Sequence, residues 1–231
     1  MTHPYATEAY ARSLAHVGEA LAVPEWDSHV LSRPTPRAAA RDATGAYPLA
    51  VIAPSANLAA GLERLRAAGL VSVVLVVDER LRPPPAALEA AFDFVRPFKS
   101  HFLLDRALGP HAYGKHHRYE LKRAFARVEA REIALADHLP AWTRLYGELA
   151  ARHGFSGLHA FPAAHHEALA RLPGVRTFAA FVEDRLVSAH VFVTHDGYGV
   201  SHLAASAAEG YATGAAYAVN DLAVGALSDC E

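Results

Sequence analysis

Residues 175–227 read VRTFAAFVEDRLVSAHVFVTHDGYGVSHLAASAAEGYATGAAYAVNDLAVGAL, and most of the architecture can be inferred from them. Two short turn sequences, Glu183-Asp184 and Asp196-Gly197, divide the first half into three apolar runs. Asp-Gly between such runs is a strong hairpin signal, and the tight first turn favours the same antiparallel pairing. The pattern predicts an antiparallel meander and then a helix, at residues 175–182, 186–194, 198–205 and 210–227.

Small residues dominate the start of the expected helix, where residues 209–216 read EGYATGAA. A helix start has backbone N–H groups without intrahelical partners and carries the positive end of the helix dipole. Small side chains let a phosphate approach these donors closely. The alternative is that Gly210 and Gly214 only let the helix pack tightly on the sheet. The residues expected to contact the phosphates are Tyr211, Ala212, Thr213, Gly214, Ala215 and Ala216.

This meander with its small-residue loop and helix resembles the acyl-CoA half of the GNAT acyltransferase fold. The phosphate motif of that family is Gln or Arg, two residues, Gly, one residue, and then Gly or Ala. Tyr211, Gly214 and Ala216 occupy these positions, and Tyr211 departs from the pattern. The resemblance implies an α/β fold with a mixed sheet (α+β, GNAT-like) and a donor that carries phosphate groups.

The FemAB-like branch of this superfamily is similar over a longer stretch, roughly residues 99–229. Its members have two GNAT-like domains, a basic helix start such as KHHRYELKRA at residues 115–124, and a strand such as SHLAAS at residues 201–206. The resemblance implies a reduced N-terminal GNAT-like domain at residues 1–98 and a C-terminal GNAT-like domain that binds the acyl donor at residues 99–231. Such proteins usually continue with a strand that completes the sheet. Without it, an exposed sheet edge is expected, through which a homo-oligomer can form.

The resemblance also implies a transferase. The donor is acyl-CoA or an aminoacyl-tRNA, the acceptor is a small-molecule or peptide amine, and the amine attacks the donor carbonyl directly. No metal is required, and a backbone N–H group near residues 200–205 is expected to stabilise the oxyanion. The alternative is a non-catalytic binding or interaction module with the same fold, which Tyr211 and the missing strand favour.

A cluster of basic residues opens the helix expected at residues 116–128. Arg118 and Lys122 are four residues apart and share one helix face. Such a cluster suits phosphate groups, because guanidinium groups bind them as forks and ammonium groups as point charges. The alternative is a solvated helix face that Glu120 and Glu129 partly neutralise. The expected substrate-binding residues are Lys115, Arg118, Lys122 and Arg123.

The chain has 15 histidines, and His202 is the expected catalytic one. It precedes the small-residue loop, where an imidazole can accept a proton from an attacking amine. The alternative is a hydrogen-bonded histidine on a half-buried strand, and His190 has the same two interpretations. His165 and His166 are adjacent and would point about 100° apart on a helix, so a zinc site with His159 is not expected.

Composition and charge limit the other classes of function. The 231 residues have a net charge of -2, so no overall positive charge attracts nucleic acid, which argues against a large RNA footprint. Cys230 is the only cysteine, which excludes an intramolecular disulfide and a thiolate zinc cluster. The longest apolar run, residues 70–77, predicts a central strand and is too short to span a bilayer. We expect a cytoplasmic protein without a signal peptide.

The first hundred residues show weaker patterns. Apolar residues at helical spacing predict a helix at residues 7–21. A short apolar run predicts a buried strand at residues 47–53.

Overall fold

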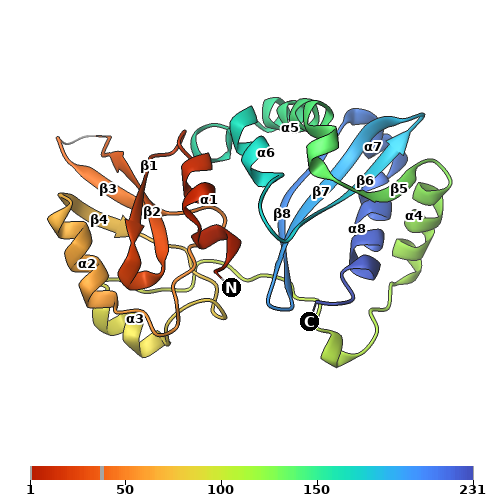
Figure 1. Cartoon of the computed structure of the whole chain (residues 1–231). Coiled ribbons are helices and arrows are strands. Elements are labelled where there is room, and N and C mark those ends of the chain that lie inside the picture. The colour runs from red at the N-terminus through yellow and green to blue at the C-terminus, as the bar shows by residue number, and fades with distance from the viewer. Residues whose placement is uncertain (1, 37–38, 231) are drawn as a thin grey trace. The chain divides into compact units, whose positions relative to one another are not determined.

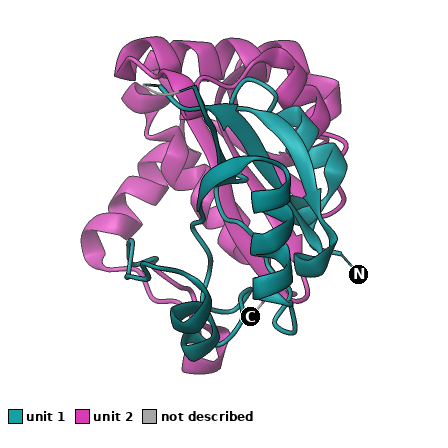
Figure 2. Ribbon diagram, turned by 90° about the vertical axis from the view of Figure 1, so that its left-hand side faces the viewer, with its two compact units in different colours: residues 1–101 teal, residues 102–231 magenta. Residues whose placement is uncertain are grey.

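The computed structural model describes residues 2–36 and 39–230, and the chain divides into two compact units. Unit 1 comprises residues 1–101 and unit 2 residues 102–231, and Figure 2 colours them separately. This boundary lies close to the one expected after residue 98. Each unit contains one four-stranded sheet, so the chain is an α/β protein.

Unit 1 has a mixed sheet of order β1-β2-β3-β4. Its elements are α1 (Glu8–Ser13), β1 (Glu19–Val23), β2 (Ser28–Pro34), β3 (Arg41–Gly45), α2 (Leu58–Ala67), β4 (Leu70–Val74) and α3 (Pro85–Ala91), with 3-10 helices at Pro4–Ala6 and Pro24–Trp26. The first three strands are antiparallel, whereas β3 and β4 are parallel and α2 connects them. One hydrophobic cluster around the fully buried Trp26 joins the sheet to α2 and α3.

The helix predicted at residues 7–21 is wrong in its second half. The helix ends at Ser13, and the chain from Glu19 onward pairs with β2 as an antiparallel strand. A Cβ atom on Gly18 would lie 2.6 Å from the carbonyl oxygen of Ser32, so the entry to this pair depends on a glycine. Tertiary pairing therefore overrides the helical spacing of the apolar residues.

The two apolar runs of unit 1 also differ from the prediction. Residues 47–53 form a loop, in which the Ala50 N–H donates to the Val76 carbonyl oxygen at 2.7 Å. Residues 70–74 do form a strand, but β4 lies at the end of the sheet and not in its centre. Because β4 is an end strand, the side chain of Val71 is 67% exposed.

Unit 2 has an antiparallel sheet of order β5-β6-β7-β8 (Figure 1). Its elements are α4 (Lys115–Phe125), β5 (Glu129–Ile133), α5 (Leu139–His153), α6 (Ala163–Leu169), β6 (Val175–Val182), β7 (Arg185–His195), β8 (Tyr198–Ser206), α7 (Ala208–Thr213) and α8 (Ala215–Ala226), with 3-10 helices at Arg106–Leu108, Leu135–His138 and Gly157–His159. α8 packs on β5, β6 and β7 and contacts α4, whereas α5 packs on β7 and β8. The central strands are therefore buried by helices.

The predicted meander is confirmed. Glu183 and Asp184 have φ values of 48° and 61°, and Asp196 and Gly197 have 46° and 78°. Positive φ at both central residues is the signature of the type I′ hairpin turn, whose twist matches that of the flanking strands. The turn residues named from the sequence thus set the register of β6, β7 and β8.

The single helix predicted at residues 210–227 is wrong, because the chain forms two helices there. α7 ends at Thr213, Gly214 follows with φ 73° in the left-handed region, and α8 begins at Ala215. Gly210 has a different role: a Cβ atom on it would lie 2.2 Å from the carbonyl oxygen of Val187. Gly210 therefore lets α7 approach β7 closely, which was the packing alternative for this glycine.

α8 is held on the sheet along its length and at its C-terminal end. Its buried residues form one hydrophobic cluster with Phe178 and Ala180 of β6. Arg106 donates hydrogen bonds to the carbonyl oxygens of Val224 at 2.6 Å and Leu227 at 3.1 Å. Cationic groups at a helix C-terminus satisfy its last carbonyls and complement the dipole, so the guanidinium caps α8.

A group of buried histidines lies between α6 and β8. His165, His166 and His202 are exposed by only 0%, 1% and 4%. The ring centroids of His165 and His202 are 6.3 Å apart. Burial lowers the pKa of His202 to about 3 and that of His166 to about 4, so both rings are neutral near neutral pH.

Among the residues that the structure describes, no helix is long and apolar enough to cross a membrane.

The close approach at Gly210 gives a stability prediction. Gly210→Ala places a methyl group against the backbone oxygen of Val187, and overpacking of this kind costs roughly 1–3 kcal/mol. Gly147→Ala, inside α5, meets no atom within 4 Å and should raise the free energy of unfolding by up to about 1 kcal/mol. Urea denaturation of both variants measures the difference. Equal effects would contradict the packing role of Gly210.

The buried His202 predicts a pH effect on stability. Its pKa is about 3 in the folded chain against 6.5 ordinarily, so below about pH 6.5 the unfolded chain binds the proton and the folded chain does not. The free energy of unfolding is therefore highest above this pH. It falls as the pH falls, by about 1.4 kcal/mol per pH unit for one group. His202→Leu should therefore flatten the fall in unfolding free energy between about pH 6.5 and pH 4.5.

His116→Leu, on the exposed part of α4, is the control for this prediction and should leave the slope unchanged. Denaturant titrations at several pH values provide the measurement. A slope in His202→Leu equal to that of the wild type would show that this ring does not set the pH dependence.

Candidate functional site

The predicted donor segment lies at the junction of α7 and α8. Tyr211, Ala212 and Thr213 form the end of α7, and Ala215 and Ala216 open α8. Two arginines from other elements reach this junction. The Arg152 guanidinium lies 4.7 Å above the Tyr211 ring, and the Arg127 guanidinium donates to the Ala212 carbonyl oxygen at 3.4 Å. The surroundings of the segment are therefore cationic.

Some of the backbone N–H groups predicted to bind phosphate already have hydrogen-bond acceptors in the chain. The Tyr211 N–H donates to the Ala207 carbonyl oxygen at 3.1 Å, and the Gly214 N–H donates to that of Tyr211 at 3.2 Å. These amides are used within and at the end of α7. A phosphate at this segment would instead meet the amides of Ala215 and Ala216, where α8 begins. Ala215 is fully buried and Ala216 is exposed, so the phosphate-binding role of the segment stays a prediction.

The basic helix α4 packs directly against α8, so the structure brings the two predicted binding segments together. A Cβ atom on Gly214 would lie 3.9 Å from that of Ala124. The His117 ring on α4 meets the Tyr217 ring on α8 edge to face, with centroids 5.0 Å apart. The predicted substrate-binding residues therefore lie on the helix that flanks the start of α8.

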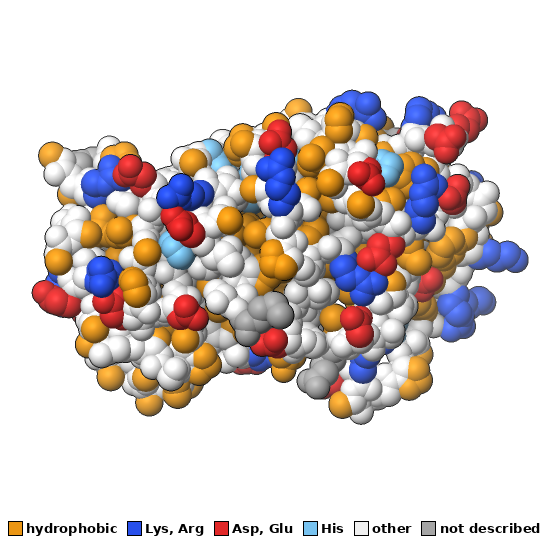
Figure 3. Space-filling view, in the orientation of Figure 1, with side chains coloured by type: hydrophobic (Ala, Val, Ile, Leu, Met, Phe, Trp, Pro, Cys, Tyr) orange, Lys and Arg blue, Asp and Glu red, His pale blue; other side chains and the backbone are white. Residues whose placement is uncertain are grey.

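Three of the four predicted basic residues are exposed, namely Lys115, Arg118 and Lys122. Figure 3 shows Lys and Arg side chains projecting at the edge of the molecule formed by α4. Arg123 is half-buried and forms an ion pair with Glu120 at 3.0 Å, so its charge is already partly neutralised. The available positive charge of α4 is thus that of the three exposed residues.

A tyrosine that the sequence analysis did not single out links α4 to α8. The Tyr113 ring stacks on His117 with centroids 4.3 Å apart. Burial, and a hydrogen bond to Asp221 of α8, raise the pKa of Tyr113 to about 12. The phenol is therefore a stable hydrogen-bond donor near neutral pH and fixes the segment before α4 to α8.

The predicted catalytic residue His202 is placed in the interior. It lies on β8, where its ring is near His165 of α6 and is 4% exposed. A neutral imidazole can accept a proton, but the lowered pKa shows that its environment disfavours the charged form. Its role as the proton acceptor stays a prediction, and its position also fits the alternative of a buried histidine.

The structure joins three other polar residues in one hydrogen-bonded group. His190 of β7 contacts the Asn220 side-chain oxygen of α8 through Nδ1 at 2.8 Å and the Ser201 hydroxyl of β8 through Nε2 at 2.7 Å. Ser201 and Asn220 are exposed, and His190 is half-buried. The sequence does not predict that His190 meets the other two residues, because no local motif connects positions so far apart in the chain.

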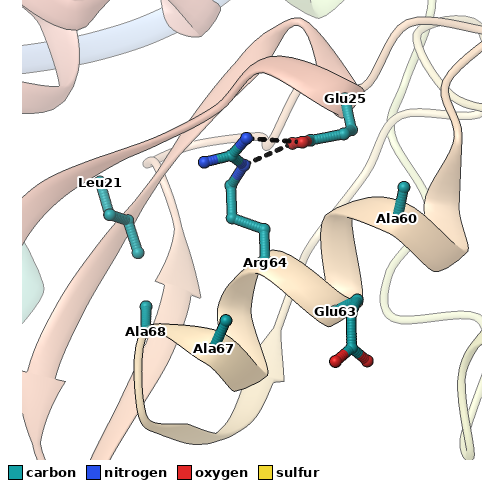
Figure 4. A pocket seen from close by; sticks show the side chains of 7 residues that line it. All are labelled: Leu21, Glu25, Ala60, Glu63, Arg64, Ala67 and Ala68. Carbon is teal, nitrogen blue, oxygen red and sulfur yellow. Dashed lines mark hydrogen bonds and ion pairs between the residues drawn. The ribbon is translucent and has the colours of Figure 1, made fainter.

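A surface hollow of about 540 Å³ lies on unit 1 (Figure 4). Its charged residues are largely paired: the Arg64 guanidinium donates to both carboxylate oxygens of Glu25 at 2.7 Å. Arg64 thereby lowers the pKa of Glu25, which fixes this carboxylate in its ionised form. We therefore regard the hollow as less suited to chemistry than the α4–α8 region. It is lined by Leu21, Glu25, Ala60, Glu63, Arg64, Ala67 and Ala68.

Over residues 2–36 and 39–230, no group of three or more His, Cys, Asp or Glu side chains is arranged to hold a metal ion.

The chain is similar to known proteins in its fold but not in its sequence. No protein-family model matches the sequence, and no curated protein matches it. Solved structures do match. The C-terminal domain (DUF2156) of a protein from Agrobacterium fabrum that is named as a lysylphosphatidylglycerol synthetase superimposes with a TM-score of 0.62 and 13% identity, over 96% of this chain and 72% of that chain. FemX superimposes with a TM-score of 0.60 and 9% identity, over 96% of this chain and 80% of that chain. Both have GNAT-like folds, and the chain described here shares that fold.

Proposed function

We propose that this chain is a transferase of the FemAB-like branch, which moves an aminoacyl group from an aminoacyl-tRNA to an amine. The observation that carries the proposal is the likeness of 96% of the chain to the C-terminal domain of a protein named as a lysylphosphatidylglycerol synthetase and to FemX. The first name denotes the attachment of a lysyl group, and transfer of an acyl or aminoacyl group is the class of chemistry that the sequence resemblance implies.

The charge distribution around the α4–α8 region supports a polyanionic donor. Lys115, Arg118 and Lys122 project from α4, and Arg127 and Arg152 reach the end of α7. Arginine and lysine side chains neutralise the phosphates of a nucleic acid, and this electrostatic contribution dominates the affinity of a protein for nucleic acid. A tRNA offers phosphates over a wide area. Cations that are spread over several elements suit such a ligand better than they suit one compact pyrophosphate.

An acyl-CoA donor is the less favoured alternative. Tyr211 replaces the Gln or Arg of the family's phosphate motif, and the Gly214 amide is bonded within α7. A pyrophosphate would therefore find fewer donors here than the motif normally provides.

The chemistry we propose is aminolysis of an ester. The acceptor, a small-molecule or peptide amine, attacks the aminoacyl carbonyl, and proximity supplies much of the acceleration because the ester is already activated. His202 is the proton acceptor inferred from the sequence, and His190 on β7 is the more accessible alternative. A backbone N–H of β8 between residues 200 and 205 stabilises the oxyanion.

Transfer can be tested with tRNA carrying radiolabelled amino acids and hydroxylamine as a simple amine. We expect labelled hydroxamate to form faster than in buffer or with heat-denatured protein. If no charged tRNA yields product and none is bound, the non-catalytic binding module becomes the better description.

The basic face of α4 predicts a salt-dependent effect on donor binding. Arg118→Ala with Lys122→Ala removes two exposed cations, so the slope of log affinity against log salt should fall by about 2 and binding should weaken at least roughly tenfold at low salt. Arg144→Ala with Arg171→Ala removes the same charge from exposed positions elsewhere in unit 2 and is the control. Fluorescence anisotropy with labelled tRNA provides the measurement. Equal losses in the two double variants would argue against a specific role of α4.

A further inference from the structure

The group Ser201, His190 and Asn220 has the connectivity of a nucleophile, a base and an orienting residue. The Ser201 hydroxyl oxygen lies 2.7 Å from Nε2 of His190, and Nδ1 of the same ring lies 2.8 Å from the side-chain oxygen of Asn220. Hydrogen-bond contact from hydroxyl to base, and from base to a third group, is the pattern by which an activated serine is identified.

The hydrogen bonds of His190 fit one tautomer. With the Asn220 oxygen facing Nδ1, this ring nitrogen carries the proton and donates it. Nε2 then has a lone pair, and the Ser201 hydroxyl is the donor in the second contact. Burial lowers the pKa of His190, which keeps the ring neutral and able to accept the hydroxyl proton at neutral pH.

An irregularity in β8 places Ser201 beside His190. The ladder pairs Val191 with Leu203 but Phe192 with Ser201, so His202 is an extra residue on β8. A β-bulge of this kind re-aims the neighbouring side chains. His202 is buried near α6, whereas the adjacent Ser201 contacts His190.

The serine is also accessible. Ser201 and Asn220 are exposed, and β8 is the end strand of the described sheet in unit 2. A serine whose only role was to hydrogen-bond the half-buried His190 ring would not need to face solvent. By contrast, the Ser188 and Ser206 hydroxyls of the same sheet are buried and bond to each other at 2.8 Å.

We propose that Ser201 is a nucleophile that forms an acyl-serine intermediate with an activated carboxylic ester, with His190 as its base and Asn220 as the residue that positions His190. This inference rests on the proposed function and replaces its direct attack by two steps on the same donor class.

The acyl group passes through Ser201 in two steps. The Ser201 oxygen bonds to the acyl carbon as its proton moves to Nε2 of His190. The bond from the acyl carbon to the donor oxygen breaks, and His190 returns the proton to the leaving alkoxide. An amine or water then attacks the acyl-serine and gives its proton to His190. Breakage of the bond between the acyl carbon and Ser201, with return of this proton, restores the hydroxyl.

The test labels the full chain with 4-nitrophenyl acetate and with an alkyl fluorophosphonate, and maps the adduct by peptide mass spectrometry. We expect a single adduct on Ser201, released nitrophenol in equal amount, and no adduct with Ser201→Ala. His190→Ala should slow labelling at least ~100-fold, the range of a general base. Ser228→Ala, at an exposed turn after α8, is the control and should label like the wild type.

The positioning role of Asn220 has its own readout. Asn220→Ala should slow labelling, whereas Asn220→Asp should restore it, because a carboxylate also accepts the Nδ1 proton of His190. A merely structural asparagine would not show this rescue, provided that circular dichroism shows all variants folded.

The outcomes separate this inference from the proposed function. No adduct on wild-type Ser201, or aminoacyl transfer that persists in Ser201→Ala, overturns the acyl-serine and leaves direct transfer standing. An adduct on Ser201 in a chain that transfers nothing to amines supports the acyl-serine and overturns the proposed transferase. An adduct that forms equally in His190→Ala overturns the assignment of the base.

Discussion

The docking of α8 on the antiparallel sheet of unit 2 is the interaction on which both candidate sites depend. Gly214 starts the helix with a left-handed residue, and Arg106 caps its other end. Between these ends, apolar residues bury against β6, so the axial position and rotation of the helix are fixed. The same helix presents Asn220 to His190 and packs against the basic helix α4.

The fold was predictable where local chemistry specifies it. Asp196-Gly197 predicts a hairpin turn because few residues tolerate positive φ, and together with the tight turn at Glu183-Asp184 it delimits the three strands. The GNAT-like fold was also inferred from the sequence, through its resemblance to that superfamily. By contrast, the sequence predicts one long helix through Gly214, since a glycine in a small-residue run gives no local sign of a left-handed conformation.

Long-range pairing accounts for the other differences. The apolar spacing predicts a helix that continues to residue 21, but β2 recruits Glu19–Val23 into a sheet. The site shows the same limit. His190 and Ser201 become neighbours only through the register of β7 and β8, and the bulge at His202 shifts that register by one residue. A lone sequence carries no signal for such a shift.

The meander also sets the sequence in which unit 2 can assemble. Hairpins with two-residue turns close locally and fast, so β7 and β8 can bring His190 and Ser201 together early in folding. Asn220 joins them only when α8 docks, which requires the chain to return across the sheet. Local detachment of this helix would therefore leave the serine–histidine pair intact while removing its third member, so the state of α8 governs whether the group is complete.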